Sequence, residues 1–409
     1  MTENLLPVDA DLAALYAPHL RFDSAEPYFP HALGYTVFRS PGHSPSSKFE
    51  IDPAGTLTLE YAIYYDWDIG HLYDLEHVWV HVGETGQVIR VEASAHGGRK
   101  PMDIGPGLPE MDATHPILYV EAGKHAHWAQ PGHMTAADRQ KLASLCGSLA
   151  GVEGVHLGNL FAQRGDYITT PRRHRLARLK MAADAFVPSH TYLASATPRL
   201  LLPWPELEAT IPQRVTEIMT DLETDQSHFA AIFLDCGDTL IDERTEVKLP
   251  GSEVVIRADL IPGAKEMMDS LKAAGHRLIL VADGPRQTFV NMLTHHGLWD
   301  HFDAHIISED VGVHKPDARM FDAALAAAGL TRDDAWRTVM VGNNLSRDIC
   351  GANALGITSV FMAWSTLRTH VPADASEVPN YRIEAPAELP GLLERLEVLT
   401  KHRAPFAQR

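Results

Sequence analysis

The pattern of hydrophobic positions changes character after about residue 228. Before that point, short aromatic and β-branched runs are broken by glycine and proline, as in LTLEYAIYY at 57–65 and HVWVHV at 77–82. Short strands separated by turn residues are typical of antiparallel sandwiches. We therefore predict a mainly β sandwich for the N-terminal part of the chain.

From residue 229 onward, fully apolar runs alternate with amphipathic segments. The apolar runs are AAIFL, LILVA, AHII, TVMVG and SVFM, and segments such as PGAKEMMDSLKAAG lie between them. A strand that is apolar at every position is buried on both faces, and strands alternating with helices build a parallel sheet covered by helices. We predict an α/β, Rossmann-like domain for this part.

The 409 residues are too many for one hydrophobic core, which indicates two domains. The stretch LLPWPELEATIP contains three prolines, and the amphipathic segment VTEIMTDLETDQ follows it. Such a change of composition is typical of an inter-domain connection. We expect a β-rich domain at 1–212, a linker at 213–228 and the α/β domain at 229–400.

Composition and charge narrow the choice of partners. The hydrophobic content of 45% is that of a globular protein, and the net charge of −18 does not favour nucleic acid or an anionic membrane as a partner. The three cysteines form neither a disulfide framework nor a zinc-finger pattern. The sequence shows no secretory signal and no membrane-spanning apolar run, so we expect a cytoplasmic location.

Polar side chains follow three of the predicted strands in the second domain. Asp235, Asp283 and Asn343 each come directly after, or end, an apolar run, while Lys315 lies on a connecting loop and Asp348 on a following helix. Because the carboxyl ends of parallel strands meet at one edge of a sheet, we expect these groups to converge. Carboxylates with a nearby lysine suit a hard cation and a phosphoryl group.

The order of these motifs resembles the haloacid dehalogenase (HAD) superfamily. The matching motifs are LDCGDTL, LILVADG, GVHKPD and VGNNLSRD, supported by IPGA and GANALGI. The resemblance implies a parallel sheet without a large cap and a Mg²⁺-dependent phosphohydrolase acting on a small or macromolecular phosphorylated substrate. Asp235 would form an aspartyl-phosphate, and Lys315 would bridge it to the phosphoryl group. The implied metal ligands are Asp235, the Gly237 carbonyl, Asn343 and Asp348, and the implied substrate-binding positions are Ala282, Asp283, Gly284 and Asn344.

Three positions depart from the pattern of the family. Gly237 stands where family phosphatases carry the acid/base Asp, which leaves Asp238 as the candidate acid; Ala282 replaces a hydroxyl residue, and Asn343 an Asp. Loss of the acid would slow expulsion of the leaving group by about 10²–10⁴-fold. Two alternatives follow: a catalytically weak or silent HAD scaffold, and a dehalogenase, in which no leaving oxygen needs a proton.

The spacing of the motifs leaves no room for a full cap domain. The gaps from Asp235 to Ala282 and from Ala282 to Lys315 are largely occupied by the predicted helices and strands. The stretch RTEVKLPGSEVVIRAD at 244–259 is long enough for a small hairpin flap. We therefore expect at most such a hairpin beside the site.

The segment YYDWDIGHLYDLEHVWVHV concentrates histidines and acids in the first domain. Asp74 and Glu76 are two residues apart, so an extended backbone points both to one face, close to His71. One imidazole and several carboxylates can bind Mg²⁺, Mn²⁺ or Ca²⁺, and Asp66 or Asp68 would complete the set. We predict a second divalent cation here; a polar network without an ion is the alternative.

The run G-H-x-x-D-x-E-H resembles the necrosis-inducing proteins, and RFDSAEPYFP at 21–30 resembles a related vacuolar-sorting-associated family. The resemblance implies that His71, Asp74 and Glu76 are metal ligands. In the silent-scaffold alternative, this domain is a metal-dependent binding module. Hydrolytic chemistry at these three residues is a further alternative.

Overall fold

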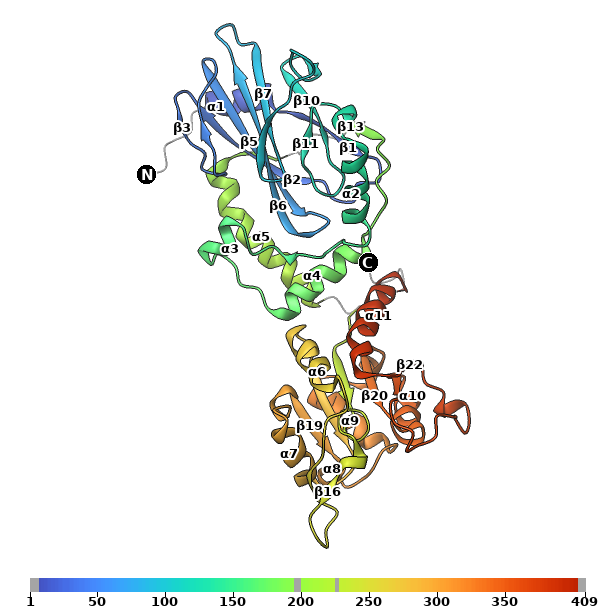
Figure 1. The fold of residues 1–409 in the computed structure, drawn as a ribbon. Helices are drawn as coiled ribbons and strands as arrows, with labels where there is room; N and C mark the ends of the chain where they lie inside the picture. The colour runs from blue at the N-terminus through green and yellow to red at the C-terminus, as the bar shows by residue number, and fades with distance from the viewer. Residues whose placement is uncertain (1–6, 195–199, 225–227, 404–409) are drawn as a thin grey trace. The chain divides into compact units, whose positions relative to one another are not determined.

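The computed structural model describes residues 7–194, 200–224 and 228–403 (Figure 1). The chain forms two compact units, unit 1 with Met1–Thr169 and Arg173–Glu223, and unit 2 with Thr170–Arg172 and Thr224–Arg409. No helix within the described ranges combines the length and the apolar character needed to cross a membrane.

The boundary between the units differs from the linker expected at 213–228. Helix α5 (Trp204–Thr224) runs without a break through the first part of that stretch, and its buried residues Val215 and Met219 pack in the core of unit 1. An apolar stripe at helical spacing must be buried against a partner, so these turns belong to the first unit.

Unit 1 contains two main sheets. One has the strand order β14-β2-β5-β6-β7-β8 with β12 beside β6, and the other has the order β11-β10-β1-β13 with β9 beside β10. The strands are β1 (His19–Asp23), β2 (Pro30–Phe38), β5 (Leu57–Trp67), β6 (His71–Val82), β7 (Val88–Ala95), β8 (Gly98–Pro101), β9 (Met111–Asp112), β10 (His115–Val120), β11 (His127–Trp128), β12 (Gly154–Val155), β13 (Tyr192–Ala194) and β14 (Leu201–Pro203); β3 (Gly42–His43) and β4 (Glu50–Ile51) form a separate hairpin.

The two faces of strand β5 pack in two different cores. Tyr65 packs with residues of both sheets, including Phe22 and Leu118, which is the contact that the predicted sandwich requires. Tyr64 points the other way and packs with residues of the helices. The helices of unit 1 are α1 (Pro7–Tyr16), α2 (Ala136–Cys146), α3 (Leu160–Arg164), α4 (Pro171–Ala183) and α5.

Unit 2 is built on a six-stranded sheet in the order β19-β18-β15-β20-β21-β22. Every neighbouring pair in it is parallel. The strands are β15 (Ala231–Leu234), β18 (Leu278–Ala282), β19 (Ala304–Ile307), β20 (Thr338–Gly342), β21 (Thr358–Met362) and β22 (Tyr381–Ile383). The predicted α/β domain with a parallel sheet is confirmed.

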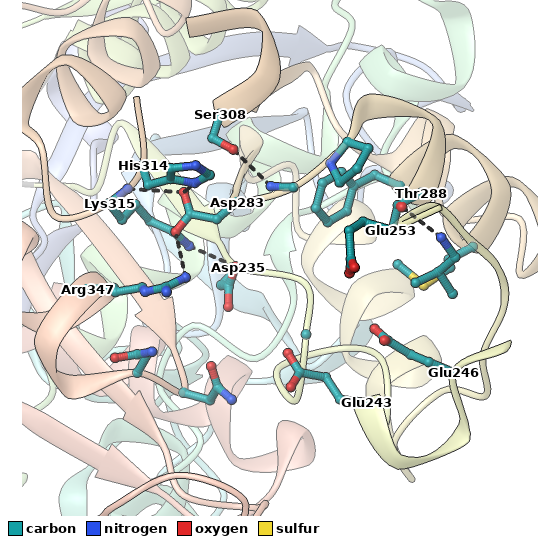
Figure 2. Close-up of a pocket in the computed structure, with 18 of the residues that line it drawn as sticks. Asp235, Glu243, Glu246, Glu253, Asp283, Thr288, Ser308, His314, Lys315 and Arg347 are labelled. Carbon is teal, nitrogen blue, oxygen red and sulfur yellow. Dashed lines mark hydrogen bonds and ion pairs between the residues drawn. The ribbon is translucent and has the colours of Figure 1, made fainter. Parts of the chain in front are cut away.

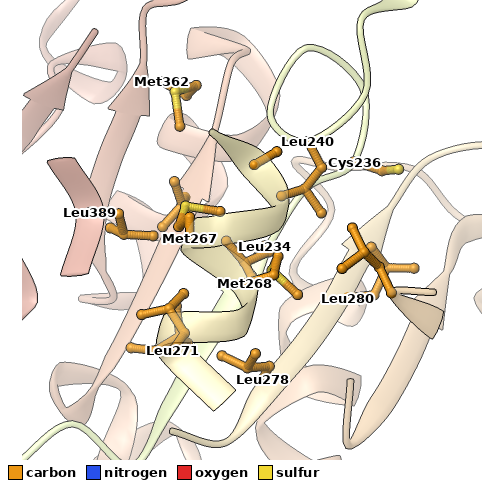
Figure 3. Close-up of a cluster of buried hydrophobic side chains, with 14 of the residues drawn as sticks. Leu234, Cys236, Leu240, Met267, Met268, Leu271, Leu278, Leu280, Met362 and Leu389 are labelled. Atoms are coloured by element: carbon orange, nitrogen blue, oxygen red, sulfur yellow. The ribbon is translucent and has the colours of Figure 1, made fainter. Parts of the chain in front are cut away.

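Helices cover both faces of this sheet. Leu234 and Leu280 pack on one face against α6 and its Met268 (Figure 3), whereas Phe233 and Val281 pack on the other face. Each fully buried side chain of this kind contributes about 1.5–3 kcal/mol, which fixes the strand ends in place. The helices are α6 (Ala264–Ala273), α7 (Arg286–His295), α8 (Ser308–Val311), α9 (Ala318–Ala327), α10 (Cys350–Leu355) and α11 (Leu389–Arg403).

Between β15 and α6, the chain forms the hairpin of β16 (Val247–Lys248) and β17 (Val255–Arg257). The prediction of a small hairpin in this stretch is confirmed. The hairpin is tied to α7, because the Val255 amide donates to Thr288 Oγ1 at 2.9 Å and the Asn291 side chain donates to the Val255 carbonyl at 2.9 Å.

Candidate functional site

Three adjacent strands bring their polar ends to one rim of the sheet in unit 2. β15 lies between β18 and β20, with Leu234 in register with both Leu280 and Val341. Asp235 therefore follows the central strand, between the residues that follow its two neighbours. This placement is what the parallel topology predicts.

Lys315 joins two carboxylates at this rim. Its Nζ donates to Asp235 Oδ1 at 2.8 Å and to the Val281 carbonyl at 2.7 Å, and it lies 2.6 Å from Asp348 Oδ1 (Figure 2). The side chains of Lys315 and Asp348 are 2% and 1% exposed, so water screens this ion pair little.

The charge of the rim is unbalanced. Burial alone would lower the pKa of Lys315, but the charges of Asp235, Asp348 and Asp283 raise it above its usual value. Burial raises the pKa of Asp348 to about 7, with Lys315 opposing the shift and Asp235 adding to it. Two carboxylates that share one lysine leave negative charge uncompensated, so a cation close to both of them would be stabilised.

The turn after β20 sets the position of Asp348. The Asn344 amide donates to Asp348 Oδ2 at 3.0 Å, and residues Leu345–Ile349 form a π-helical turn. A side chain on Gly342 would clash with the Asp348 carboxyl group, so this position requires glycine. Asn343 and Asn344 both line the cavity at the rim.

Asp283 organises the opposite side of the rim. It accepts a hydrogen bond from the Lys315 amide at 3.0 Å and lies 3.5 Å from Arg347 Nη1. The Gly284 amide donates to Ser308 Oγ at 2.8 Å. Ala282, expected at a substrate-binding position, is fully buried in the core, so its side chain does not reach the cavity.

Asp238, the acid expected from the sequence, lies beneath the loop after β15. It is fully buried, its backbone has a φ of 46°, and its Oδ1 accepts a hydrogen bond from the Glu243 amide at 3.1 Å. Its Oδ2 has no hydrogen-bond partner within the described part of the chain. The carboxylate of Asp238 therefore braces this loop, whereas the cavity is lined by Gly237 and Glu243.

Glu243 is a residue that the sequence motifs did not indicate. Its carboxylate lies over Gly237, where any added Cβ would clash with Glu243 Oε1. It pairs with Arg368 at 3.0 Å. Burial raises the pKa of Glu243, Arg368 opposes the shift, and Asp238 and Asp235 raise the pKa further. The glycine in place of the family acid was the available signal, because it leaves room for a carboxylate from elsewhere in the chain.

These groups surround a cavity of about 550 Å³. Figure 2 shows Lys315, Arg347 and His314 on one side, and Glu243 on the side formed by the chain leading to the hairpin. The polar side chains that line it are Asp235, Glu243, Glu246, Lys248, Glu253, Asp283, Thr288, Ser308, Glu309, His314, Lys315, Asn343, Asn344, Arg347, Asp348 and Arg368.

In unit 1, His71, Asp74 and Glu76 all line a cavity of about 710 Å³, but they have different partners. His125 Nδ1 lies 3.1 Å from Asp74 Oδ2, and Glu76 accepts a hydrogen bond from Ser94 Oγ. Burial alone would lower the pKa of His125, but hydrogen bonds and charges from Asp74 and a nearby glutamate raise it to about 10.

The two aspartates proposed to complete that set have partners of their own. Asp66 pairs with Arg214 at 2.7 Å, and Asp68 pairs with Lys124 at 2.5 Å. Asp68 also lies 3.8 Å from His71 Nε2. Asp68, Asp74 and His125 form one group of potential ligand atoms, and His71, Glu153 and His156 form another.

Comparison with known proteins identifies the second unit. Residues 248–362 match the family described as haloacid dehalogenase-like hydrolase. A phosphoserine phosphatase of Thermus thermophilus is 32% identical over 127 residues, which are 31% of this chain and 48% of that protein. A glyceraldehyde 3-phosphate phosphatase of Methanopyrus kandleri is 30% identical over 138 residues, which are 34% of this chain and 56% of that protein.

The crystal structure of a HAD phosphatase from Thermococcus onnurineus is 28% identical, with a TM-score of 0.29, and the match covers 33% of this chain and 59% of that one. The chain spans about half the length of the curated relatives it matches. The family match lies within unit 2, and the resemblance of unit 1 to the necrosis-inducing and vacuolar-sorting-associated families stays a prediction. The C-terminal region of this chain is a haloacid dehalogenase-like hydrolase domain.

Proposed function

We propose that unit 2 is a Mg²⁺-dependent phosphohydrolase that cleaves phosphate monoesters through an aspartyl-phosphate on Asp235. The observation that carries the proposal is Lys315, whose Nζ lies 2.8 Å from Asp235 and 2.6 Å from Asp348 at the rim of a HAD-type sheet. The relatives named above are phosphatases, which supports the same reaction class.

The residues at the rim fit a magnesium ion. The donors would be carboxylates of Asp235 and Asp348, the Gly237 carbonyl and the Asn343 amide oxygen, a set of hard oxygens that suits Mg²⁺ better than Zn²⁺. Asp235 and Asp348 both contact one lysine nitrogen, so a small cation can reach both. When bound, the ion would offset the negative charge of the phosphoryl oxygens.

The reaction needs a nucleophile, a charge partner and a proton. The Asp235 carboxylate attacks phosphorus and the ester bond breaks, while Lys315 stabilises the charge on the phosphoryl oxygens. The departing oxygen takes up a proton and leaves as an alcohol. Water then hydrolyses the acyl phosphate, which releases inorganic phosphate and regenerates Asp235.

We propose Glu243 as the source of that proton in place of Asp238. The Glu243 carboxylate lies over Gly237 and lines the cavity, whereas Asp238 is fully buried. A proton donor must come within hydrogen-bond reach of the leaving oxygen, so position decides between the two carboxylates.

A small phosphorylated molecule is the substrate that the cavity supports best. Its volume of about 550 Å³ is within the usual range of small-molecule sites. Arg347 and His314 lie beside Asp283 and offer donors to further polar groups of a substrate. Substrate recognition by these side chains, a cytoplasmic location and a separate metal-binding role for unit 1 are parts of the same proposal.

The test is hydrolysis of a panel of small phosphomonoesters, with and without Mg²⁺, by the full chain and by Asp235→Asn. We expect Mg²⁺-dependent phosphate release that Asp235→Asn abolishes. Trapping with beryllium fluoride and Mg²⁺ provides a second measurement, because a competent site should hold one phosphoryl mimic on Asp235. Activity that survives Asp235→Asn would exclude this mechanism, and a lack of both turnover and trapping would favour the silent scaffold.

A further inference from the structure

Three ligand-type side chains meet at the start of strand β6 in unit 1, away from the family motifs of unit 2. They are His71, Glu153 and His156, and one potential ligand atom from each lies within 4.8 Å of the other two. Two of these residues come from a segment in which the hydrophobic pattern and the motifs predicted no site.

The backbone brings this segment to His71. Strand β12 pairs in parallel with the start of β6, with Gly154 in register with His71. The Glu153 amide donates to the Gly70 carbonyl at 2.9 Å, and the Gly151 amide donates to the Ile69 carbonyl at 2.7 Å. Main-chain hydrogen bonds therefore fix the positions of Glu153 and His156, which leaves their side chains available for another role.

The imidazole of His71 is oriented as a metal-ligating histidine usually is. Its Nδ1 lies 2.9 Å from the Tyr73 carbonyl oxygen, which can only accept, so Nδ1 carries the proton. In the neutral ring, Nε2 is then a lone-pair donor. A carbonyl that fixes the tautomer in this way is the common outer partner of a metal-bound imidazole. The carbonyl is presented by an unusual backbone, since Tyr73 has a φ of 65°.

His156 and Glu153 complete the group. The ring of His156 stacks on that of His71 at 4.6 Å between centroids, and its Nδ1 lies 3.8 Å from Glu153 Oε2. Ligands about 2.0–2.2 Å from a tetrahedral zinc lie roughly 3.3 Å from one another. The group must therefore contract by about 1.5 Å, which a rotation of the Glu153 side chain, 53% exposed, can supply.

We propose that unit 1 binds a zinc ion through His71, Glu153 and His156, with a coordination position open to the adjoining cavity. Two imidazoles and one carboxylate are a ligand set of catalytic zinc sites, and the nitrogen donors favour Zn²⁺ over Mg²⁺ or Ca²⁺. Both imidazoles line the cavity of about 710 Å³, so a fourth ligand can reach the ion from there. The ion belongs to this second set of residues and not to the trio of His71, Asp74 and Glu76.

The neighbouring acids do not compete for the ion on equal terms. Asp74 is held by His125 at 3.1 Å, Asp68 by Lys124 at 2.5 Å, and Glu76 by Ser94. A carboxylate that already accepts from a cation or a hydroxyl must lose that bond to bind a metal.

The experiment measures Zn²⁺ binding to the tag-free full chain after treatment with a chelator. Titration is followed by competition with a chromophoric zinc chelator in millimolar Mg²⁺, which occupies oxygen-ligand sites. We expect one tight equivalent of Zn²⁺. His156→Ala should weaken it by more than about 100-fold, because even groups that only orient a ligand account for about 10–100-fold. Glu153→Gln should weaken it less.

His43→Ala is the matched control, since His43 lines the same cavity and its side chain is 62% exposed. It should leave zinc affinity unchanged. Thermal unfolding in chelator should be the same for His156→Ala and the parent chain, which excludes misfolding as the cause. Cobalt substitution adds a spectroscopic readout, with visible absorption bands that His156→Ala removes.

Two results would overturn the proposal. One is zinc affinity that is unchanged in the double variant His71→Ala/His156→Ala. The other is zinc binding that Asp74→Asn abolishes while His156→Ala leaves it intact, which would assign the ion to the trio around Asp74. Neither outcome depends on phosphatase activity in unit 2.

Discussion

Replacing Lys315 with methionine removes the positive charge that Asp235 and Asp348 share, with little change in side-chain volume. Lys315 Nζ lies 2.8 Å and 2.6 Å from the two carboxylates, and its side chain is 2% exposed. The variant therefore leaves two acids close together in a poorly solvated place. Both the stability of unit 2 and the chemistry of the site should respond.

The size of the effect follows from burial. Removing one partner of a buried ion pair costs about 3–5 kcal/mol, because the remaining charge is left without compensation. In Lys315→Met, Mg²⁺ would become the cation that compensates both carboxylates, so the variant should bind Mg²⁺ more tightly than the parent chain. A tenfold tighter affinity narrows the difference in free energy of unfolding by about 1.4 kcal/mol at saturating metal. Turnover should fall by about 10²–10³-fold, the usual effect of losing one charge-stabilising group.

The assay is urea unfolding of Lys315→Met and the parent chain, in chelator and in saturating Mg²⁺, with phosphatase kinetics in parallel. Lys272→Met is the matched control, because Lys272 forms an exposed pair with Asp303 at 3.3 Å, and exposed pairs contribute about 0–1 kcal/mol. A destabilisation no larger than that of the control would refute the reasoning about buried charge. A gap that stays the same with and without Mg²⁺ would refute the shared cation site.

Three further predictions test separate parts of the structure. Asp235→Asn should abolish turnover and leave the circular dichroism spectrum unchanged; an active variant would show that another group is the nucleophile. Glu243→Gln should slow hydrolysis of alkyl phosphates by about 10²–10⁴-fold but spare 4-nitrophenyl phosphate, whose leaving group needs no proton; Glu246→Gln, in the same cavity, should do neither, and an equal loss on both substrates would contradict the role of Glu243 as an acid. Burial lowers the pKa of His127 to about 4, below the unfolded value of 6.5, so its contribution to stability is complete above pH 6.5 and is lost as the pH falls toward 4, by roughly 3 kcal/mol in total; urea unfolding between pH 7.5 and 4.5 should show a shallower pH dependence in His127→Gln, and an unchanged slope would refute this assignment.

The fold of unit 2 could be predicted because its signals are local and strong. A strand such as β18 is apolar at every position, and the helix α6 that packs beside it has its apolar residues at helical spacing. Parallel topology then places the ends of β15, β18 and β20 together without any further information. The convergence of Asp235 with Lys315 and Asp348 follows from these two facts.

Other parts of the two sites depend on contacts that have no local signature. Strand β12 has two residues, too few for a periodic pattern, yet it brings Glu153 and His156 beside His71. The burial of Ala282 in the core is also a tertiary property, since its place directly before Asp283 made a role at the site equally reasonable. Sequence patterns of period 2 or 3.6 specify which face is buried, and not which distant loop lies over it.

Gly237 shows how a departure from a family motif can be compensated from elsewhere in the chain. In the motif alone, the glycine is a missing acid and favours a silent scaffold. In the folded chain, the space above that glycine holds the Glu243 carboxylate, and a side chain at position 237 would displace it. The loop between them is held by Asp238, which accepts the Glu243 amide at 3.1 Å and so fixes where Glu243 begins. Asp238 and Glu243 thus divide between them what one aspartate does in the family pattern: Asp238 shapes the loop, and Glu243 presents the carboxyl group to the cavity. An acid that has moved in sequence and kept its place in space is invisible to motif comparison, which explains why the sequence alone left catalysis and silence both open.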